Sequence, residues 1–86
     1  MDIGVEISLY PLKADYIPAV HEFLADLKLH PGLRVVTNSM STQLFGGFEE
    51  VMDELRTALA AGLARVAAGS ERAVFVMKVI GPLPSA

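Results

Sequence analysis

A cluster of polar side chains at residues 37–43 is the part of this sequence best suited to binding chemistry. The seven residues read Thr-Asn-Ser-Met-Ser-Thr-Gln, and each side chain carries a hydroxyl, amide or thioether group. Together with the Leu-Phe-Gly-Gly that follows, they predict a strand end, a tight reversal near Ser41, and a return strand over residues 42–45. A hairpin needs fewer polar residues than this, so the surplus indicates a further role. The alternative is that these side chains serve turn chemistry alone.

Cysteine and histidine usage argues against several other kinds of site. The chain contains no cysteine, which excludes disulfides, thiolate zinc sites and thiol catalysis. His21 and His30 are nine residues apart, one on a predicted helix and one in a predicted turn, so we expect solvated imidazoles rather than a metal site. An acylphosphatase-like anion cradle would need an arginine after the first strand, where this chain has Pro-Leu-Lys-Ala. We therefore expect no metal, no cofactor and no catalytic residue.

The charge balance makes nucleic acid and membranes poor partners for this chain. Its net charge is -3, and lysine and arginine form no cluster that would attract nucleic acid or an anionic membrane. No apolar run reaches the length of about 18 residues that a membrane span requires. Met1-Asp2 leads directly into a strand pattern without a basic segment or cleavage site. We expect no membrane span, no export signal and a cytoplasmic location.

Apolar periodicity divides the chain into four strands and two helices. Residues 3–10 alternate apolar and polar side chains, which predicts a strand with one core face and one mixed face. Asp15 is placed to cap a helix that runs to about Lys28, and Gly69 is placed to end a second helix that begins at Phe48. The strands are predicted at residues 3–10, 33–38, 42–45 and 73–80.

This order of elements predicts an α+β fold of the ferredoxin-like type. A four-stranded antiparallel sheet with both helices on one face is the compact arrangement that the order strand, helix, strand, strand, helix, strand favours. We expect the first and last strands in the centre of the sheet because they are the most apolar. The last strand, residues 73–80, is apolar on both faces and is therefore expected to be buried on both. We expect one domain over residues 1–80 and a loose tail over residues 81–86.

The sheet face without helices is expected to be covered by a second copy of the chain. Apolar residues make up 52% of the sequence, a high share for a chain of this size, which buries only about two thirds of its unfolded surface. The open face would carry Tyr10, Val36, Met40 and Phe45 beside part of the last strand. We therefore expect a homo-oligomer that closes this face.

Two short motifs resemble those of the thiamine-binding family of the YkoF and MTH1187 type. Ile-Ser-Leu-Tyr-Pro-Leu at residues 7–12 resembles the family's first-strand signature, and Met-Ser-Thr at residues 40–42, with Gly46 and a Glu-Glu-Val-Met helix start, resembles its second. The match covers about residues 3–80 with the same order of elements. The resemblance implies a non-enzymatic domain that binds thiamine or its hydroxymethylpyrimidine part and forms dimers that pair into tetramers. Phe45 stands where many single-domain relatives carry an acidic residue, so the exact ligand stays open.

The ligand that the resemblance implies would suit polar side chains on the first strand and in the hairpin. An aminopyrimidine presents a donor amine beside ring-nitrogen acceptors, so its site needs a few neutral hydrogen-bonding groups and a flat apolar wall, and it can include a carboxylate. The alternatives are a solvated or interface-paired carboxylate for Glu6, backbone-satisfied hydroxyls for Ser8 and Thr42, and a packing role for Tyr10. The candidate ligand-binding residues are Glu6, Ser8, Tyr10, Asn38, Ser41 and Thr42.

Two other classes of function are alternatives to a ligand-binding protein. One is a small oligomerisation or regulatory module whose open face meets only protein partners, with the polar hairpin at the margin of that interface. The other is a dimeric ferredoxin-like enzyme of the cofactor-free oxygenase kind. That enzyme would need a base such as histidine in its pocket, and His21 and His30 are poorly placed for it.

Overall fold

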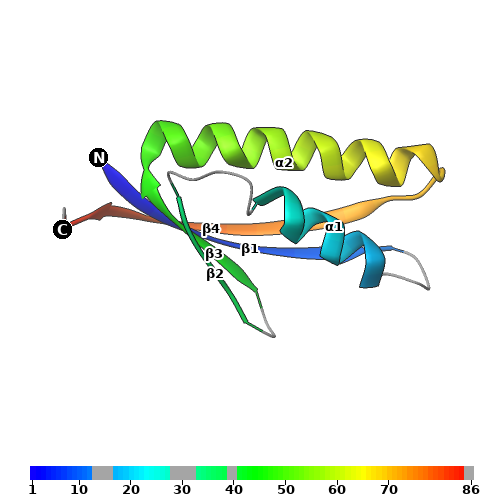
Figure 1. Ribbon diagram of the computed structural model, residues 1–86, viewed down its shortest axis with the longest axis horizontal. Coiled ribbons are helices and arrows are strands. Elements are labelled where there is room, and N and C mark those ends of the chain that lie inside the picture. The colour runs from blue at the N-terminus through cyan, green and yellow to red at the C-terminus, as the bar shows by residue number, and fades with distance from the viewer. Residues whose placement is uncertain (13–16, 28–32, 39–40, 85–86) are drawn as a thin grey trace.

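The computed structural model describes residues 1–12, 17–27, 33–38 and 41–84. It confirms the ferredoxin-like α+β fold and the expected order of elements (Figure 1). Helix α2 lies along the length of the long strands, and both termini lie at the same end of the molecule. In chain order the elements are β1 (Asp2–Pro11), α1 (Ile17–Leu27), β2 (Arg34–Thr37), β3 (Thr42–Gly47), α2 (Phe48–Ala68) and β4 (Ala73–Leu83).

The sheet is antiparallel with the strand order β2-β3-β1-β4, so β1 and β3 are the central strands. The expectation that the last strand would be central is wrong. Each helical connection passes over one strand position: α1 leads from β1 to β2 across the place of β3, and α2 leads from β3 to β4 across β1. The two crossovers interleave, and this leaves β2 and β4 at the edges.

Strand β4 is also not buried on its two faces, although its sequence is apolar on both. Val79 and Ile80 point to opposite faces and are 60% and 64% exposed. Helix packing reaches β4 at Phe75, whose ring centroid lies 5.1 Å from that of Phe23 in α1. Beyond that point Met77, on the same face, is already 44% exposed. The apolar run of β4 therefore forms a surface that the single chain leaves exposed.

The hydrophobic core lies between one face of the sheet and both helices. Alternate residues of β1 point into it, and they meet side chains from β3, α1 and α2. Because both helices pack on the same residues of β1, both lie on one face of the sheet, as expected. The core residues are Ile3, Val5, Ile7, Phe23, Leu27, Leu44, Val51, Leu55 and Ala58.

Helix α2 begins and ends where the sequence predicts. It follows Gly47 directly, and at its other end the Gly69 N–H donates to the Val66 carbonyl oxygen at 3.2 Å. Near that end Arg65 forms ion pairs with two carboxylates of α1, those of Glu22 and Asp26. These contacts join the two helices on one side of the sheet. The site discussed below is on the other side, the open face.

Some expectations fall outside the described residues, and one boundary differs. The predicted helix cap Asp15, the turn residue His30 and the open-face residue Met40 are not described, and neither is the side chain of His21. Strand β4 continues to Leu83 through residues 81–83, which were expected to belong to a loose tail. Among the described helices, none combines the length and the apolar character needed to cross a membrane.

The core assignment predicts unequal effects for two neighbouring apolar residues on opposite sheet faces. Leu44 of β3 is 0% exposed, and Val36 of β2 is 41% exposed. Leu44→Ala should lower the free energy of unfolding by about 2–5 kcal/mol, because it removes buried methyl groups and leaves a cavity. Val36→Ala is the control, with an expected loss below about 1 kcal/mol. Urea unfolding would measure both; equal losses would contradict this placement of the core.

Candidate functional site

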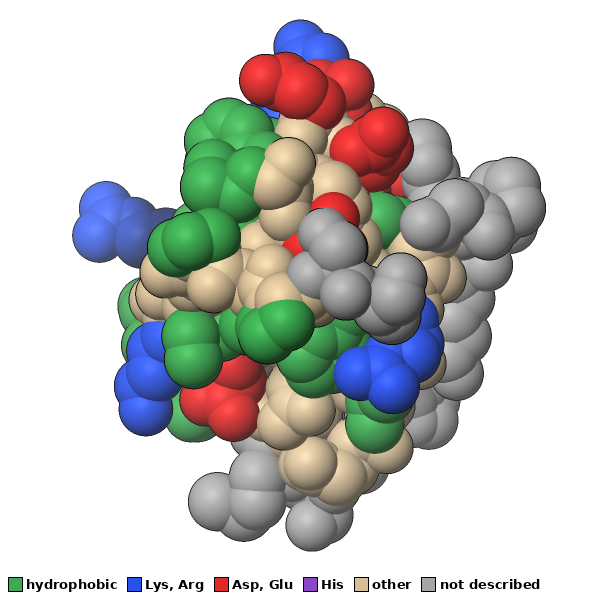
Figure 2. Space-filling model, turned by 90° about the vertical axis from the view of Figure 1, so that its left-hand side faces the viewer, with side chains coloured by type: hydrophobic (Ala, Val, Ile, Leu, Met, Phe, Trp, Pro, Cys, Tyr) green, Lys and Arg blue, Asp and Glu red, His purple; other side chains and the backbone are tan. Residues whose placement is uncertain are grey.

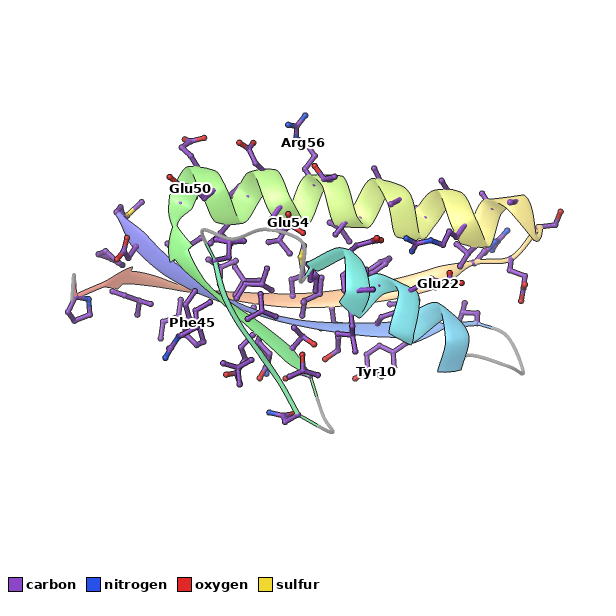
Figure 3. All side chains as sticks on the ribbon, viewed as in Figure 1. Tyr10, Glu22, Phe45, Glu50, Glu54 and Arg56 are labelled. Atoms are coloured by element: carbon purple, nitrogen blue, oxygen red, sulfur yellow. The ribbon has the colours of Figure 1, made fainter. Side chains whose placement is uncertain are left out.

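The open face of β1 carries the first group of predicted site residues. Glu6, Ser8 and Tyr10 alternate with core residues and therefore share the face turned away from the helices. Figure 3 shows Tyr10, and Phe45 of β3, on the side of the sheet opposite α2. The structure thus brings together three of the six predicted ligand-binding residues.

A hollow on this face lies over the first half of β1, from Gly4 to Glu6. It has a volume of about 230 Å³. The strand register explains its position: Gly4 has Phe45 as its neighbour on β3 and Ile80 as its neighbour on β4, and the next residue on this face, Glu6, is opposite Gln43. The residues that line the hollow are Gly4, Val5, Glu6, Gln43, Phe45 and Ile80.

Gly4 lets the side chains of Phe45 and Ile80 pack closely over the backbone of β1. A Cβ at this position would lie 3.1 Å from two ring carbons of Phe45 and 3.2 Å from Cγ2 of Ile80. A side chain at this position would therefore force Phe45 or Ile80, which line the hollow on either side, to move. The Phe45 wall has a second contact, because the guanidinium carbon of Arg34 lies 4.4 Å from the centre of its ring. This cation–π contact favours one orientation of the ring.

Glu6 supplies the negative charge at the hollow. Its side chain is 41% exposed, and its carboxylate lies 3.9 Å from Nζ of Lys78, whose side chain is 80% exposed. Such an exposed ion pair contributes at most about 1 kcal/mol. A ligand with a hydrogen-bond donor can therefore compete with Lys78 for this carboxylate at little cost.

Ser8 and Tyr10 have a different setting from that of Glu6. The pairing of β1 with β3 ends at Ile7 and Thr42, so beyond that point β1 is flanked by β4 alone. Tyr10 is 55% exposed. Ser8 and Tyr10 thus continue the polar line away from the hollow, on a part of the face that one neighbouring strand borders.

The three predicted site residues of the hairpin do not join this line. The Asn38 side-chain oxygen accepts a hydrogen bond from the Ser41 N–H at 3.0 Å, and the Asn38 N–H donates to the Ser41 carbonyl oxygen at 3.1 Å. These bonds close the turn, so the turn-chemistry alternative explains both residues. Thr42 is 3% exposed, pairs with the core residue Ile7, and lies with its hydroxyl 3.2 Å from that of Thr37. Thr42 therefore points to the helix side, the opposite face from Ser8.

Sequence reasoning missed the apolar part of the hollow and one buried carboxylate. The alternation of residues 3–10 places Gly4 on the mixed face of the first strand, but its partners on β3 and β4 cannot be known without the register. Glu54 of α2 is 1% exposed and lies on the underside of the helix (Figure 3). It is three residues after Val51 and four before Ala58, so helical spacing places it on the buried stripe. That spacing was the signal available in the sequence.

The N-terminus of α2 is already occupied by groups of the chain itself. The Phe48 N–H donates to the Met1 carbonyl oxygen at 2.9 Å. The Glu50 carboxylate folds back over Gly47, where any added side chain would collide with it. Glu49 and Glu50 also place two negative charges in the first turn. Although a helix start after Gly-Gly is a common anion site, this one repels anions. In the described part of the chain, His, Asp and Glu form no group that could hold a metal ion.

The fold and the comparisons with known proteins define the class of this protein. The two-layer α+β arrangement is shared with the hypothetical protein MJ1052 of Methanocaldococcus jannascii, at a TM-score of 0.79 and 25% identity over 99% of this chain and 84% of that one. Protein SP2199 of Streptococcus pneumoniae superposes at a TM-score of 0.84 with 21% identity, over 96% of this chain and 89% of that one. The protein is therefore a ferredoxin-like domain that shares its fold with these two structures.

The family is shown by the sequence itself. The model of the YKOF-related family matches residues 2–76, and the chain belongs to that family. Another similar structure is TM0486 of Thermotoga maritima, to which a role in thiamine biosynthesis or salvage is ascribed; its TM-score is 0.80 at 17% identity, over 95% of this chain and 85% of that one. No curated protein matches the chain in sequence.

Proposed function

We propose that this protein binds thiamine, or the hydroxymethylpyrimidine part of thiamine, without catalysing a reaction. The observation that carries the proposal is the hollow beside Glu6 on the open sheet face, in a chain of the YKOF-related family. The thiamine-related role ascribed to the similar Thermotoga maritima protein supports the choice of ligand. The exposed carboxylate and apolar walls suit an aromatic ring with an exocyclic amine.

The proposed ligand-binding residues are Glu6, Ser8 and Tyr10. Glu6 would accept a hydrogen bond from the exocyclic amine, Ser8 would exchange one with a neutral group of the ligand, and Tyr10 would present an aromatic face. Asn38, Ser41 and Thr42 would contribute by fixing the hairpin that begins β3, rather than by touching ligand. A role of this kind needs no cofactor, and the lack of cysteine suits a cytoplasmic location.

We also propose that the protein is a homodimer that pairs into a tetramer. The exposed apolar residues of β4 support assembly: Val74 and Val76 on the open face are 45% and 47% exposed, and Val79 on the other face is 60% exposed. Hydrophobic side chains reach the surface at the end of the molecule where both termini lie (Figure 2). An uncovered edge strand with apolar faces favours association. A pure oligomerisation module is the competing function, and only ligand binding distinguishes the two.

The first functional prediction concerns the ligand and the sheet face that holds it. Thiamine and hydroxymethylpyrimidine should each stabilise the protein, by about 2.7 kcal/mol when the ligand is at 100 times its Kd. Ser8→Ala should weaken binding roughly ten-fold, because losing a buried hydrogen-bond partner costs about 1–3 kcal/mol. Thr42→Val is the matched control on the opposite face and should leave the affinity unchanged. Thermal-shift assays and calorimetry would measure both effects.

Two outcomes would count against this assignment. If no thiamine-related ligand changed the melting temperature, the protein would be an oligomerisation module rather than a ligand-binding one. If Thr42→Val weakened binding and Ser8→Ala did not, the ligand would lie on the helix side of the sheet, and the open-face site would be wrong.

The start of α2 generates a prediction about phosphorylated ligands. Thiamine diphosphate should bind more weakly than thiamine, because Glu49 and Glu50 repel an anion and Glu50 already covers the helix N-terminus. Competition titrations at several salt concentrations would measure the two affinities. A diphosphate that bound more tightly than thiamine, with an affinity that fell steeply as salt rose, would show that basic groups form the site.

The apolar surface of β4 predicts how a charge would affect assembly. Val76→Lys should dissociate the oligomer, because a lysine there would be desolvated without a partner in the interface. Thr57→Lys adds the same charge on an exposed position of α2 and should leave assembly intact. Light scattering would give the mass of each variant. A wild-type protein that stayed monomeric at micromolar concentration would rule out the proposed oligomer.

A further inference from the structure

We infer that β4 pairs with β4 of a second copy of the chain, antiparallel and about a two-fold axis at Val76, so that the two sheets become one. The inference rests on the proposed homo-oligomer, and it specifies which strand the copies share and in which register. Strand β4 is at the edge of the sheet, and β1 is its one neighbour among the described strands. Exposed edges are usually blunted by charges, prolines or bulges. Between residues 73 and 80 the only charge is Lys78, and there is no proline.

One hydrogen bond shows which backbone groups of β4 face the free edge. The Leu12 N–H donates to the Arg72 carbonyl oxygen at 2.9 Å, one step beyond the pair of Pro11 and Ala73. Hydrogen-bonded and non-hydrogen-bonded pairs alternate along an antiparallel ladder. Because the pairing with β1 is regular from residue 73 to residue 80, the even-numbered residues of β4 bond to β1. The residues whose N–H and C=O groups point outward are Ala73, Phe75, Met77 and Val79.

These outward groups are self-complementary in one register. With the two-fold axis at Val76, Ala73 is opposite Val79 of the partner subunit, and Phe75 is opposite Met77 of the partner subunit. Each such pair exchanges two hydrogen bonds. Every outward N–H and C=O group of the regular stretch then has a partner, as buried backbone groups require.

Other registers leave part of the edge unpaired or place charges together. An axis at Met77 would pair Ala73 with Gly81, which lies where the register with β1 shifts. An axis at Lys78 would place two lysines directly opposite each other, and like charges in that position are destabilising. Axes nearer to either end of the strand pair fewer residues. The register with Val76 at the axis is therefore favoured.

The side chains on the open face suit the same register. Val76 meets its own copy at the axis, and Val74 is opposite Lys78 of the partner subunit. The Lys78 stem can cover an apolar neighbour while its charged end stays in water. Within one chain that end lies 3.9 Å from the Glu6 carboxylate. Pairing thus covers apolar side chains of β4 without burying an unpaired charge.

Single cysteines test the register, because the chain has no cysteine of its own. Val76→Cys places two thiols in a non-hydrogen-bonded pair, whose Cα atoms are about 4.5 Å apart, within the range of about 4.4–6.8 Å found in disulfides. Oxidation with diamide should convert most of this variant to a covalent dimer on a non-reducing gel. Lys78→Cys is the matched control on the same face: its two thiols would be about 13 Å apart along the strands and should not cross-link.

A mixture of two variants tests the opposing positions. Val74→Cys and Lys78→Cys should each remain uncross-linked alone and should cross-link when they are refolded together, because positions 74 and 78 are opposite each other across the axis. Lys78→Cys that cross-linked with itself as fast as Val76→Cys would overturn the register.

Amide hydrogen exchange tests the pairing in the wild-type chain without any cysteine. The outward N–H groups of Phe75, Met77 and Val79 are hydrogen-bonded in the pair, so they should exchange as slowly as that of Lys78, which bonds to β1. In Val76→Lys, which should be monomeric, the three outward groups should lose this protection while Lys78 keeps it. Fast exchange of the outward groups in a wild-type oligomer would overturn the pairing.

Failure of the strand pairing and failure of the proposed assembly give different results. A wild-type protein that light scattering shows to be an oligomer, but whose Val76→Cys variant does not cross-link, would retain the assembly and overturn β4 as its interface. A wild-type monomer with unprotected outward amides would overturn both.

Discussion

The pairing of β1 with a strand on each side is the constraint on which the rest of the structure depends. Its core residues form the floor under both helices, and the residues between them form the open face. Because strand side chains alternate, a slip of one residue against β3 or β4 would place Glu6 in the core and Ile7 in solvent. The cost of burying that carboxylate fixes the register. The same register sets Gly4 between Phe45 and Ile80, so the core determines where the hollow forms.

Much of the fold could be predicted from local sequence patterns, because the faces of a strand and the ends of a helix depend on residues that are close in sequence. Alternation identified β1 and its two faces, and Gly69 ended α2 as expected, with its N–H bonded to a carbonyl of the last turn. The position of β4 was not predictable in this way. The same sequence pattern, apolar on both faces, is found in a central strand buried by its neighbours and in an edge strand that is exposed in the single chain. Only the interleaving of the two crossovers decides between these, and that is a property of the whole chain.

The candidate site was predictable only in part, for a reason that lies in the hairpin register. Asn38, Ser41 and Thr42 are polar neighbours in sequence, and composition alone assigns them one role. In the structure Asn38 and Ser41 are hydrogen-bonded to each other. Thr42 is the partner of the core residue Ile7 on β1, so it points to the same face as Ile7. A cluster in sequence is thus divided between a turn and a buried face. Residues far apart in sequence, such as Gly4 and Ile80, meet instead because antiparallel pairing brings strand ends together.

The open face of β1 is divided into two parts with different capacities. Between Gly4 and Glu6 the strand has neighbours on both sides, so side chains from β3 and β4 can form two walls. At Ser8 and Tyr10 only β4 is adjacent, and the other side is open. Side chains of one chain can therefore border a bound group on two sides only in the first part. Under the proposed function, any portion of a ligand that extends along Ser8 and Tyr10 would have one wall from this chain, and another copy would supply the second. If the protein binds a ligand and assembles as proposed, the geometry of this single strand would couple the two: a ligand that spans both parts would bind the assembled form more tightly and so favour assembly.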